Sequence, residues 1–289
     1  MSNLKKKLAE VIAIFIFGLA CLLVADLWDS AHGLKVNEYT YATDELDEDI
    51  TVVVISDLHE MEFGEGNQAL IEQVTAQSPD LIFMLGDMMN EDSTNPHIVF
   101  KLIERLLDIA PVYFAPGNHE LMYMKHQDAQ ILDKLQEAGA IVLEMEYADI
   151  EVKGSSLRIG GFYGYAIYLD YYNDPETLER KEFLTEFLDT DRLTLMLSHR
   201  PDSFVFADSA RRWDIDLVLS GHLHGGQIVL PFLGGVYGGD QGWFPEYVHG
   251  LYQKDNMHIF VTSGLGTNPQ KVPRINNLPE IAVICIEPE

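Results

Sequence analysis

The chain has few cysteines and few cationic residues for its length. Its two cysteines are Cys21 and Cys285, and Cys21 lies in an apolar segment, so Cys285 has no plausible disulfide partner. This excludes a disulfide framework and a zinc ribbon. Lys and Arg total 19 against 46 Asp and Glu, which gives a net charge of −27 at pH 7. Such an acidic surface repels nucleic acid and anionic headgroups unless metal ions intervene, so we expect no nucleic-acid partner.

Internal repeats and low-complexity runs are also lacking. A chain of 289 residues that is 47% hydrophobic is long enough for one large domain or two small ones. The acidic stretch DELDED at 44–49 is typical of a solvated linker before the first strand. We therefore divide the chain into an N-terminal anchor or signal segment over 1–28, an acidic linker over 29–49 and one folded domain over 50–289.

The one long apolar run lies at the N-terminus. Lys5, Lys6 and Lys7 precede it, and the 21 residues from Leu8 to Trp28 carry only two charges, Glu10 and Asp26. About 20 apolar residues cross a bilayer, and flanking lysines favour the cytoplasmic side. The pattern predicts a single-pass signal anchor in the cell membrane, with the domain outside the cytoplasm. The domain without these 28 residues has 16 Lys and Arg against 44 Asp and Glu, a net charge of −28.

Three other interpretations of this segment fit less well. A cleaved signal peptide is the nearest alternative, but Leu23 and Ala25 form a poor cleavage site and the run is long for such a peptide. Cys21 is the residue a lipoprotein would need, yet the apolar run continues past it. A buried core helix is disfavoured by the three lysines and by the lack of a polar face.

Beyond residue 50, short β-branched runs alternate with helical patterns. The order at the start is βαβαβ, which predicts a parallel sheet covered by helices. We expect an α/β fold with two sheets packed face to face and helices outside. The expected strands are 51–56, 81–85, 112–115, 141–143, 149–153, 157–161, 194–197, 217–219, 259–263 and 281–286, and the expected helices are 67–77, 97–108, 127–138 and 176–188.

Five of these strands are followed by side chains that bind metals. Parallel strands place their carboxyl ends at one edge, where open α/β sheets bind ligands, so we expect these side chains to converge on a metal site. Any one of them alone could simply cap a helix or close a turn. They are Asp57 and His59, then Asp87, then Asn118 and His119, then His199, then His222 and His224.

The spacing within each group indicates how ions could be held. In extended chain, residues i and i+2 point the same way, so Asp57 and His59 are expected to hold one ion. His222 and His224 repeat this spacing. Asp87 stands alone and can bridge two ions, whereas the adjacent Asn118 and His119 point apart, one toward a metal and one toward substrate.

These blocks resemble those of a known family. DLH at 57–59, GD at 86–87, GNHE at 117–120, the His of LSHRPD at 199 and GHLH at 221–224 are similar to the five blocks of calcineurin-like metallophosphoesterases. The resemblance covers everything after about residue 50. HGGQ at 224–227, GLGTN at 264–268 and LPEI at 278–281 further resemble the membrane-associated bacterial YkuE/YaeI-like branch.

The resemblance implies a four-layer α/β/β/α sandwich with two divalent ions. By position, Asp57, His59, Asp87 and His224 would hold the first ion, and Asp87, Asn118, His199 and His222 the second. Mn²⁺ is the metal the family implies, although oxygen and imidazole ligands also fit Fe or Zn²⁺.

The resemblance also implies the reaction. Two cations ~3.5–4 Å apart activate a bridging water for in-line attack on phosphorus. The substrate would be a phosphodiester, a phosphomonoester or a pyrophosphate. His119 is expected to protonate the leaving oxygen, with Asn118 fixing its position. The alternative is a non-catalytic metal-dependent binding module, which would not require His119.

The substrate is predicted less sharply. The branch includes enzymes that cleave UDP-2,3-diacylglucosamine, but that lipid lies on the cytoplasmic side, whereas an exported enzyme acting on envelope lipids or polymers fits the anchor. Val229 stands where many members carry a basic residue. Two aromatic groups, in 162–173 and 232–247, could hold an acyl chain or sugar, although ordinary packing also explains them. Expected substrate contacts are Arg200, Gly225, Gly226, Gln227 and Arg274, with Lys271 as a further cation.

Overall fold

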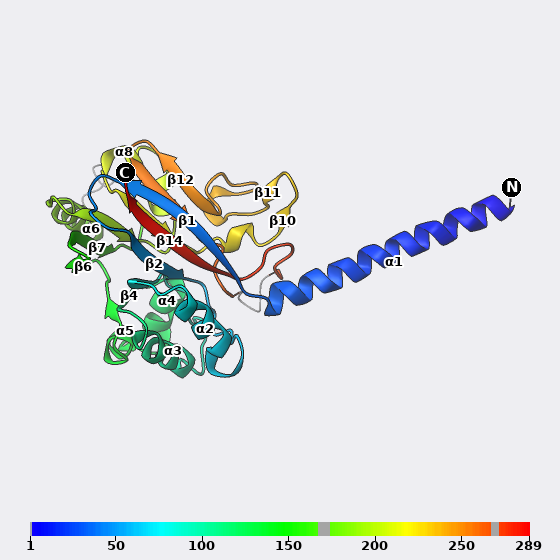
Figure 1. Ribbon diagram of the computed structural model, residues 1–289, viewed down its shortest axis with the longest axis horizontal. Coiled ribbons are helices and arrows are strands. Elements are labelled where there is room, and N and C mark those ends of the chain that lie inside the picture. The colour runs from blue at the N-terminus through cyan, green and yellow to red at the C-terminus, as the bar shows by residue number, and fades with distance from the viewer. Residues whose placement is uncertain (1, 167–173, 267–271) are drawn as a thin grey trace.

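Two six-stranded sheets form the centre of the domain. The computed structural model describes residues 2–166, 174–266 and 272–289 (Figure 1). The first sheet has the order β1-β14-β2-β3-β4-β5, and β2 to β5 run parallel. Its strands are β1 (Lys35–Thr43), β14 (Glu280–Pro288), β2 (Ile50–Ile55), β3 (Leu81–Met84), β4 (Val112–Phe114) and β5 (Ile141–Val142).

The second sheet has the order β12-β13-β9-β8-β7-β6. Its four inner strands β13, β9, β8 and β7 are parallel, and β12 and β6 pair antiparallel at the edges. The strands are β12 (Gly250–Lys254), β13 (Met257–Val261), β9 (Leu217–Ser220), β8 (Leu193–Leu197), β7 (Ser155–Gly161) and β6 (Tyr147–Val152).

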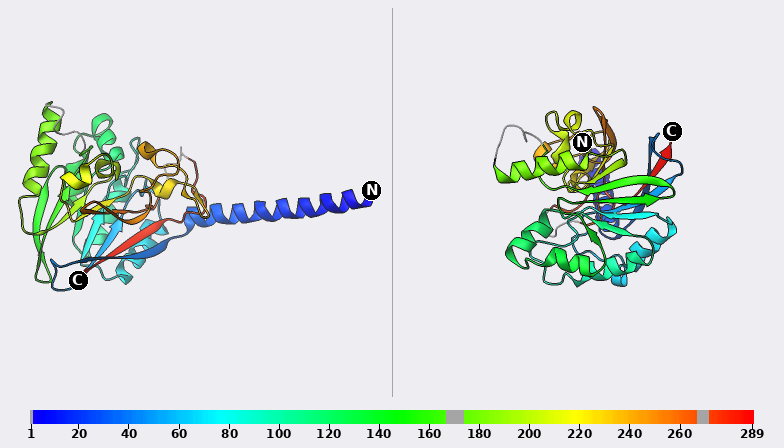
Figure 2. Two further views of the ribbon diagram at one scale, coloured as in Figure 1. Left: turned by 90° about the horizontal axis from the view of Figure 1, so that it is seen from above. Right: turned by 90° about the vertical axis from the view of Figure 1, so that its left-hand side faces the viewer.

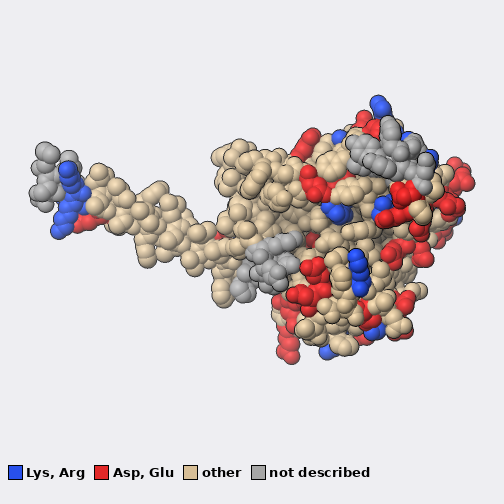
Figure 3. Space-filling view, turned by 180° about the vertical axis from the view of Figure 1, so that it is seen from behind, with Lys and Arg blue, Asp and Glu red and all other residues tan. Residues whose placement is uncertain are grey.

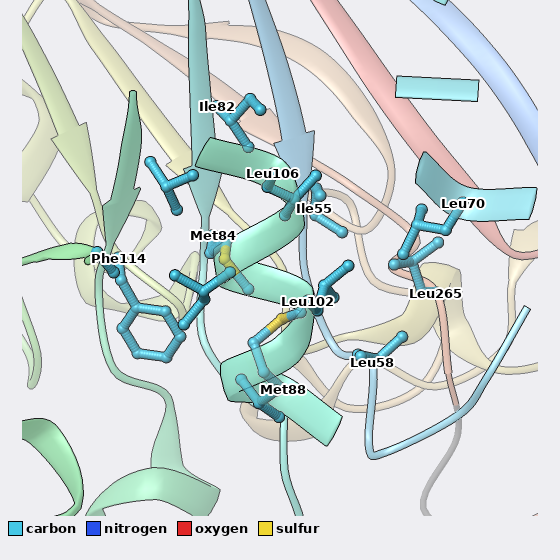
Figure 4. Packing of buried hydrophobic residues seen from close by; sticks show 14 of the residues in the cluster. Ile55, Leu58, Leu70, Ile82, Met84, Met88, Leu102, Leu106, Phe114 and Leu265 are labelled. Carbon is cyan, nitrogen blue, oxygen red and sulfur yellow. The ribbon is translucent and has the colours of Figure 1, made fainter. Parts of the chain in front are cut away.

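Side-chain alternation in the strands produces three apolar layers. Val52 and Val54 of β2 face the second sheet, while Val53 and Ile55 face helices, as the period of two requires. Figure 4 shows α3 packed on the first sheet, with Leu102 near Ile55 and Met84. The first sheet is covered by α2 (Gln68–Ala76), α3 (His97–Leu107), α4 (Asn118–His126) and α5 (Ile131–Glu137), and the second by α6 (Pro175–Phe187), α7 (Asp202–Val205) and α8 (Ser209–Arg212).

The result is the expected α/β/β/α sandwich, which the end-on view of Figure 2 shows as layers. The expected strands and helices are present to within a few residues, except that the predicted helix over 127–138 begins only at Ile131. A helix that was not expected, α4, precedes it. Its apolar face is short, so it carries little of the periodicity by which a helix is found in sequence.

The predicted linker over 29–49 is corrected by the structure. Its middle, Lys35–Thr43, forms β1, which pairs in parallel with β14 at the edge of the first sheet. Only 44–49, the acidic part, connects β1 to β2 as a turn. The strand is inconspicuous in the sequence because an edge strand buries few of its side chains, here chiefly Tyr41 and Thr43.

The N-terminal helix α1 (Ser2–His32) projects from the domain (Figure 1). Its segment Lys5–Ser30 is long and apolar enough to cross a membrane, and the apolar window is not buried against the domain. A signal sequence has the same properties. The helix is tied to the domain at its base, where the Asp26 carboxylate accepts the backbone N–H of Asn276 at 2.8 Å.

Candidate metal centre

The ligand-type residues follow the carboxyl ends of β2, β3, β4, β8 and β9, as expected. The local backbone differs from the expectation, however. Asp57 (φ 55°), His59 (φ 49°), Asp87 (φ 51°), His222 (φ 69°) and His224 (φ 47°) are in the left-handed region, so these residues do not continue their strands. The extended i, i+2 geometry predicted for Asp57 with His59, and for His222 with His224, is therefore wrong. Such backbone is costly for non-glycine residues and is typical of functional sites, where the surrounding structure holds it in place.

The left-handed turns bring the side chains into overlapping groups. Within each group, one candidate ligand atom per residue lies within 4.8 Å of the others. The groups are Asp57, His59 and His224; His59, Asp87 and His119; and Asp87, His199 and His222. Asp87 belongs to two of them, and His222 and His224 belong to different ones. The first and third groups contain six of the seven predicted ligand positions, whereas the second group also includes His119. Asn118 precedes His119 at the start of α4.

Three histidines are oriented by bonds on the side away from the centre. Nδ1 of His59 lies 3.1 Å from Oδ1 of Asn90. Nδ1 of His199 lies 2.6 Å from the Leu85 carbonyl oxygen, and Nδ1 of His224 lies 3.2 Å from that of Gly266. Each oxygen accepts the Nδ1 proton, so Nε2 carries the lone pair in the neutral ring. Metal-binding histidines are held in this way in general.

Several buried polar atoms in this region have no hydrogen-bond partner among the described residues. They are Oδ1 of Asp57, Nε2 of His59 and Oδ1 of Asn118. A buried acceptor without a partner costs free energy, and native proteins rarely leave one. All three are potential metal donors on residues of the predicted ligand set. The donor set thus fits divalent cations, although it does not identify the metal.

The charges at the centre are strongly coupled. Oδ2 of Asp87 lies 3.1 Å from Nε2 of His199. Burial opposes charge on both groups, but the carboxylate raises the pKa of His199 to about 9, and the imidazolium holds the pKa of Asp87 well below its usual range. In the protein without metal, His199 therefore carries a proton at neutral pH, and that proton neutralises part of the acidic site.

Glu120 is a site residue to which sequence reasoning gave no role. It is fully buried, and its carboxylate accepts the backbone N–H groups of Asp87, Met88, Met89 and Gly117 at 2.8–3.2 Å. It therefore ties the loop after β3 to the start of α4. Burial raises the pKa of Glu120 to about 7. Its place in GNHE, three residues into a helix, was the available signal.

Two glycines let the strand ends approach each other. A Cβ at Gly221 would lie 2.4 Å from Oδ2 of Asp57, so the loop after β9 can pass the Asp57 carboxylate only with glycine there. A Cβ at Gly117 would lie 2.3 Å from Oδ1 of Asp87. Because the loop after β9 passes so close to Asp57, the backbone N–H of His222 can donate to the Asp57 carboxylate at 3.0 Å.

His119 differs from His59, His199 and His224 in the tautomer that its contacts select. Its Nδ1 accepts the backbone N–H of Glu91 at 3.0 Å, so in the neutral ring the proton is on Nε2. Nε2 lies 3.8 Å from Oδ2 of Asp87, on the inner side of the site. The backbone N–H of His119 donates to Oδ1 of Asp87 at 2.8 Å. His119 thus presents a proton toward the centre.

The predicted substrate contacts lie in different surroundings. Arg200 is half-buried and donates to the Tyr165 hydroxyl at 2.7 Å and to Asp240 at 2.5 Å. Arg274 is 4% exposed and donates to the carbonyls of Ser263 and Gly266. Arg274 is therefore held mainly by backbone carbonyls. Its guanidinium also lies 3.4 Å from Nδ1 of His224, on the side away from the centre.

The HGGQ segment at 224–227 also makes contacts that stabilise the fold. A Cβ at Gly226 would lie 2.5 Å from Cα of Gly235, so this glycine admits the neighbouring strand β11 (Gly234–Gly235). Gly225 is likewise buried, against Ser263 and Asn277. Gln227 donates to the Val272 carbonyl. These contacts explain the two glycines without substrate, whereas Gln227 also lines a cavity beside the histidines.

That cavity has a volume of about 750 Å³ and adjoins His222 and His224. Its other walls are mainly apolar or aromatic side chains and glycines, including Ile228, Tyr237 and Trp243. The second aromatic group of the sequence thus borders the centre. In the first group, Phe162 is buried in the core behind α6. Tyr168, Tyr171, Tyr172, Thr267, Asn268 and Lys271 lie outside the described residues.

Comparison with known proteins gives relatives of the expected kind. The chain is 31% identical over 231 residues to an uncharacterised metallophosphoesterase of Campylobacter jejuni, which covers 76% of this chain and 55% of that protein. It is 29% identical to the metallophosphoesterase YkuE of Bacillus subtilis, with 82% and 78% covered, and 27% identical to the phosphodiesterase YaeI of Escherichia coli, with 81% and 80% covered. The chain spans little more than half the length of the Campylobacter protein and of a Helicobacter pylori relative.

The calcineurin-like phosphoesterase model matches residues 50–226, which is more than half of the chain and includes β2 to β4, β8, β9 and every residue of the three groups. The resemblance seen in the sequence is thereby confirmed. This chain belongs to the calcineurin-like phosphoesterase family.

Proposed function

We propose that the protein is a hydrolase that uses two divalent cations to cleave phosphoric esters, with a phosphodiester as its preferred substrate. The observation that carries the proposal is the overlap of the groups at Asp87, together with the outward Nδ1 contacts of His59, His199 and His224. The preference for diesters is supported by the name of the Escherichia coli relative, a phosphodiesterase.

Two of the three groups support the predicted ligand assignment. Asp57, His59 and His224, with Asp87, would hold one ion, and Asp87, His199 and His222, with Asn118, the other. Manganese is our first choice, with iron and zinc as alternatives. When bound, such ions polarise the phosphoryl oxygens and ionise a water at neutral pH.

The protein's own groups then act on the leaving side of the reaction. His119 would donate the proton on Nε2 to the departing oxygen, because the Glu91 N–H keeps Nδ1 unprotonated in the neutral ring. Asp87 accepts the His119 backbone N–H, and Glu120 accepts the backbone N–H of Asp87. These contacts fix the position of the proton donor His119 relative to the Asp87 carboxylate. Of the predicted substrate contacts, Arg200 and Gln227 remain candidates for binding the ester.

The membrane is the proposed location. The length and apolar character of α1 support a single-pass anchor, and Lys5 to Lys7 at its start favour a domain outside the cytoplasm. A lipid or polymer of the envelope fits this placement and the apolar cavity beside His222 and His224. A UDP-2,3-diacylglucosamine-type lipid is the alternative substrate, but it requires the opposite orientation.

The first test is hydrolysis of bis-p-nitrophenyl phosphate and p-nitrophenyl phosphate by the detergent-solubilised full chain, with Mn²⁺ and with chelator. Asp87→Asn should abolish metal-dependent turnover, because the carboxylate is shared by two groups. Asp214→Asn, an exposed carboxylate before β9, is the matched control and should leave turnover unchanged. Two tightly bound metals with no turnover on either ester would instead favour the binding-module alternative.

A further inference from the structure

The hairpin beside the candidate metal centre carries exposed apolar side chains and no charge. It consists of β10 (Val229–Leu230), a turn and β11, and the stretch 225–239 has no charged residue although 22% of the chain is charged. At its turn, Phe232 is fully exposed and Leu233 is 64% exposed. Trp243 and Phe244 in the next loop are 71% and 54% exposed. A soluble domain rarely leaves so many large apolar side chains in one place.

The hairpin lies next to the base of α1. Asn276 joins the two, because its backbone N–H donates to Asp26 of α1 and its side-chain Nδ2 donates to the Val229 carbonyl at 3.0 Å. Ile228 and Ile275 form a parallel bridge beside this contact. Figure 1 places β10 and β11 on the side of the domain from which α1 leaves, and Figure 3 shows an uncharged surface on that side. The hairpin and the helix therefore face the same direction.

We propose that residues 230–233 of the hairpin insert into the bilayer that holds α1, as a second membrane contact of the domain. The inference rests on the proposed membrane anchoring by α1 and goes beyond it. The contact is apolar rather than electrostatic, because the domain is strongly acidic and would be repelled by anionic headgroups. Large apolar and aromatic side chains are the kind that enter the interface of a neutral bilayer.

The insertion has a consequence for the site. The cavity beside His222 and His224 is lined by Ile228, Val236 and Tyr237, which directly flank the hairpin, so lipid contact at the turn places the cavity against the membrane surface. A phosphoester with an acyl chain could then reach the centre without leaving the bilayer. The acidic faces of the domain remain in water.

The test measures the depth of the hairpin in lipid. The full chain carrying Cys21→Ala and Cys285→Ala receives one new cysteine, Phe232→Cys or Leu233→Cys, labelled with an environment-sensitive fluorophore. The protein is reconstituted in phosphatidylcholine vesicles, with or without brominated acyl chains. Leu178→Cys is the control, because Leu178 is 47% exposed on α6, at the end of the domain away from α1 (Figure 1).

Brominated lipid is expected to quench the label at 232 and 233 severalfold more than at 178, and aqueous iodide should show the reverse. Anionic lipid should not strengthen the effect. Equal quenching at the three positions would overturn the proposal, and so would a label shielded from both quenchers, since protein would then cover the hairpin. Failure of the chain to float with vesicles would overturn the anchor proposal as well.

The readout is independent of catalysis, so a failed phosphoesterase assay leaves it intact. If turnover is found, Phe232→Ser with Leu233→Ser should keep the rate on soluble bis-p-nitrophenyl phosphate. The same variant should lose rate on a long-chain alkyl p-nitrophenyl phosphodiester embedded in phosphatidylcholine vesicles. An equal rate on both substrates would contradict the functional consequence of insertion.

Discussion

Glu91 donates its backbone N–H to Nδ1 of His119 across 3.0 Å, and this bond decides which nitrogen of the ring carries the proton. Because Nδ1 must accept, the neutral imidazole has its proton on Nε2, 3.8 Å from the Asp87 carboxylate. His59, His199 and His224 have the opposite arrangement, with Nδ1 facing an oxygen acceptor. One histidine of the site is therefore arranged to give a proton, and three are arranged to give a lone pair.

His119→Ala should retain both metals and lose turnover mainly on esters with poor leaving groups. General acid catalysis contributes about 10²–10⁴-fold, and p-nitrophenolate needs little of it. The measurement compares kcat on bis-p-nitrophenyl phosphate and on an alkyl phosphodiester, with metal content determined on the same samples. His97→Ala removes an exposed histidine from α3 and is the control. An equal loss on both esters would remove His119 from the role of proton donor.

Glu120→Gln should weaken metal binding by about 10–100-fold, as replacement of groups that orient ligands does. The amide has one oxygen for four backbone N–H groups, so the loop that carries Asp87 loses part of its support. Titration with Mn²⁺ against an indicator chelator measures the change. Glu137→Gln, at an exposed position on α5, should behave as the parent protein. Unchanged affinity would show that the backbone holds the loop without this carboxylate.

Metal affinity should rise with pH through the neutral range. The pKa of His199 is raised to about 9 without metal, and the bound ion requires the neutral ring, so binding releases this proton. One released proton corresponds to about a tenfold loss of affinity for each pH unit below that pKa. Competitive titrations between about pH 6 and pH 8 would detect this slope. A flat profile over that range would mean that His199 is already neutral in the metal-free protein.

Glu280→Gln should destabilise the fold at neutral pH, by about 1–3 kcal/mol in unfolding free energy. The buried carboxylate accepts from Thr262 and Ser263 at the end of β13 and from Asn37 and Tyr39 of β1, and it lies 2.9 Å from His249. Burial raises its pKa, but these contacts, with His249 first, hold the pKa well below its usual range.

The pH dependence of this effect has a definite sign. A depressed pKa stabilises the folded state above the unfolded pKa of about 4.3, and the contribution disappears as pH falls through the folded value. The difference in Tm between parent and Glu280→Gln should therefore be full at pH 7 and shrink below about pH 4. Glu287→Gln, farther along β14, is the comparison. A difference that stays constant into acid would show that the charge of Glu280 is not what stabilises this junction.

The order of the elements and the positions of the ligand-type residues could be predicted from the sequence, because buried parallel strands are short apolar runs and their ends are marked by Asp, His and Asn. The backbone conformation at those strand ends could not be predicted from the sequence. Asp57 and His222 have left-handed φ. Gly221 and Gly264, which follow strands of the second sheet, lie against the Asp57 side chain, and such contacts depend on tertiary packing. The residue types in GNHE do not indicate how many N–H groups Glu120 accepts. The burial of Arg274 depends on how the loop after β13 folds around its guanidinium, which donates to the Ser263 and Gly266 carbonyls.

The metal groups draw on both halves of the sandwich. Asp57, His59 and Asp87 follow strands of the first sheet, whereas His199, His222 and His224 follow strands of the second. The group of Asp57, His59 and His224 and the group of Asp87, His199 and His222 each need residues from both sheets. An ion can therefore bind to either group only after the two halves have docked. Ion binding is then linked to folding: a ligand at 100 times its Kd stabilises the docked state by about 2.7 kcal/mol. The supply of divalent ions in the protein's surroundings thereby becomes a determinant of its lifetime, separately from its rate of catalysis.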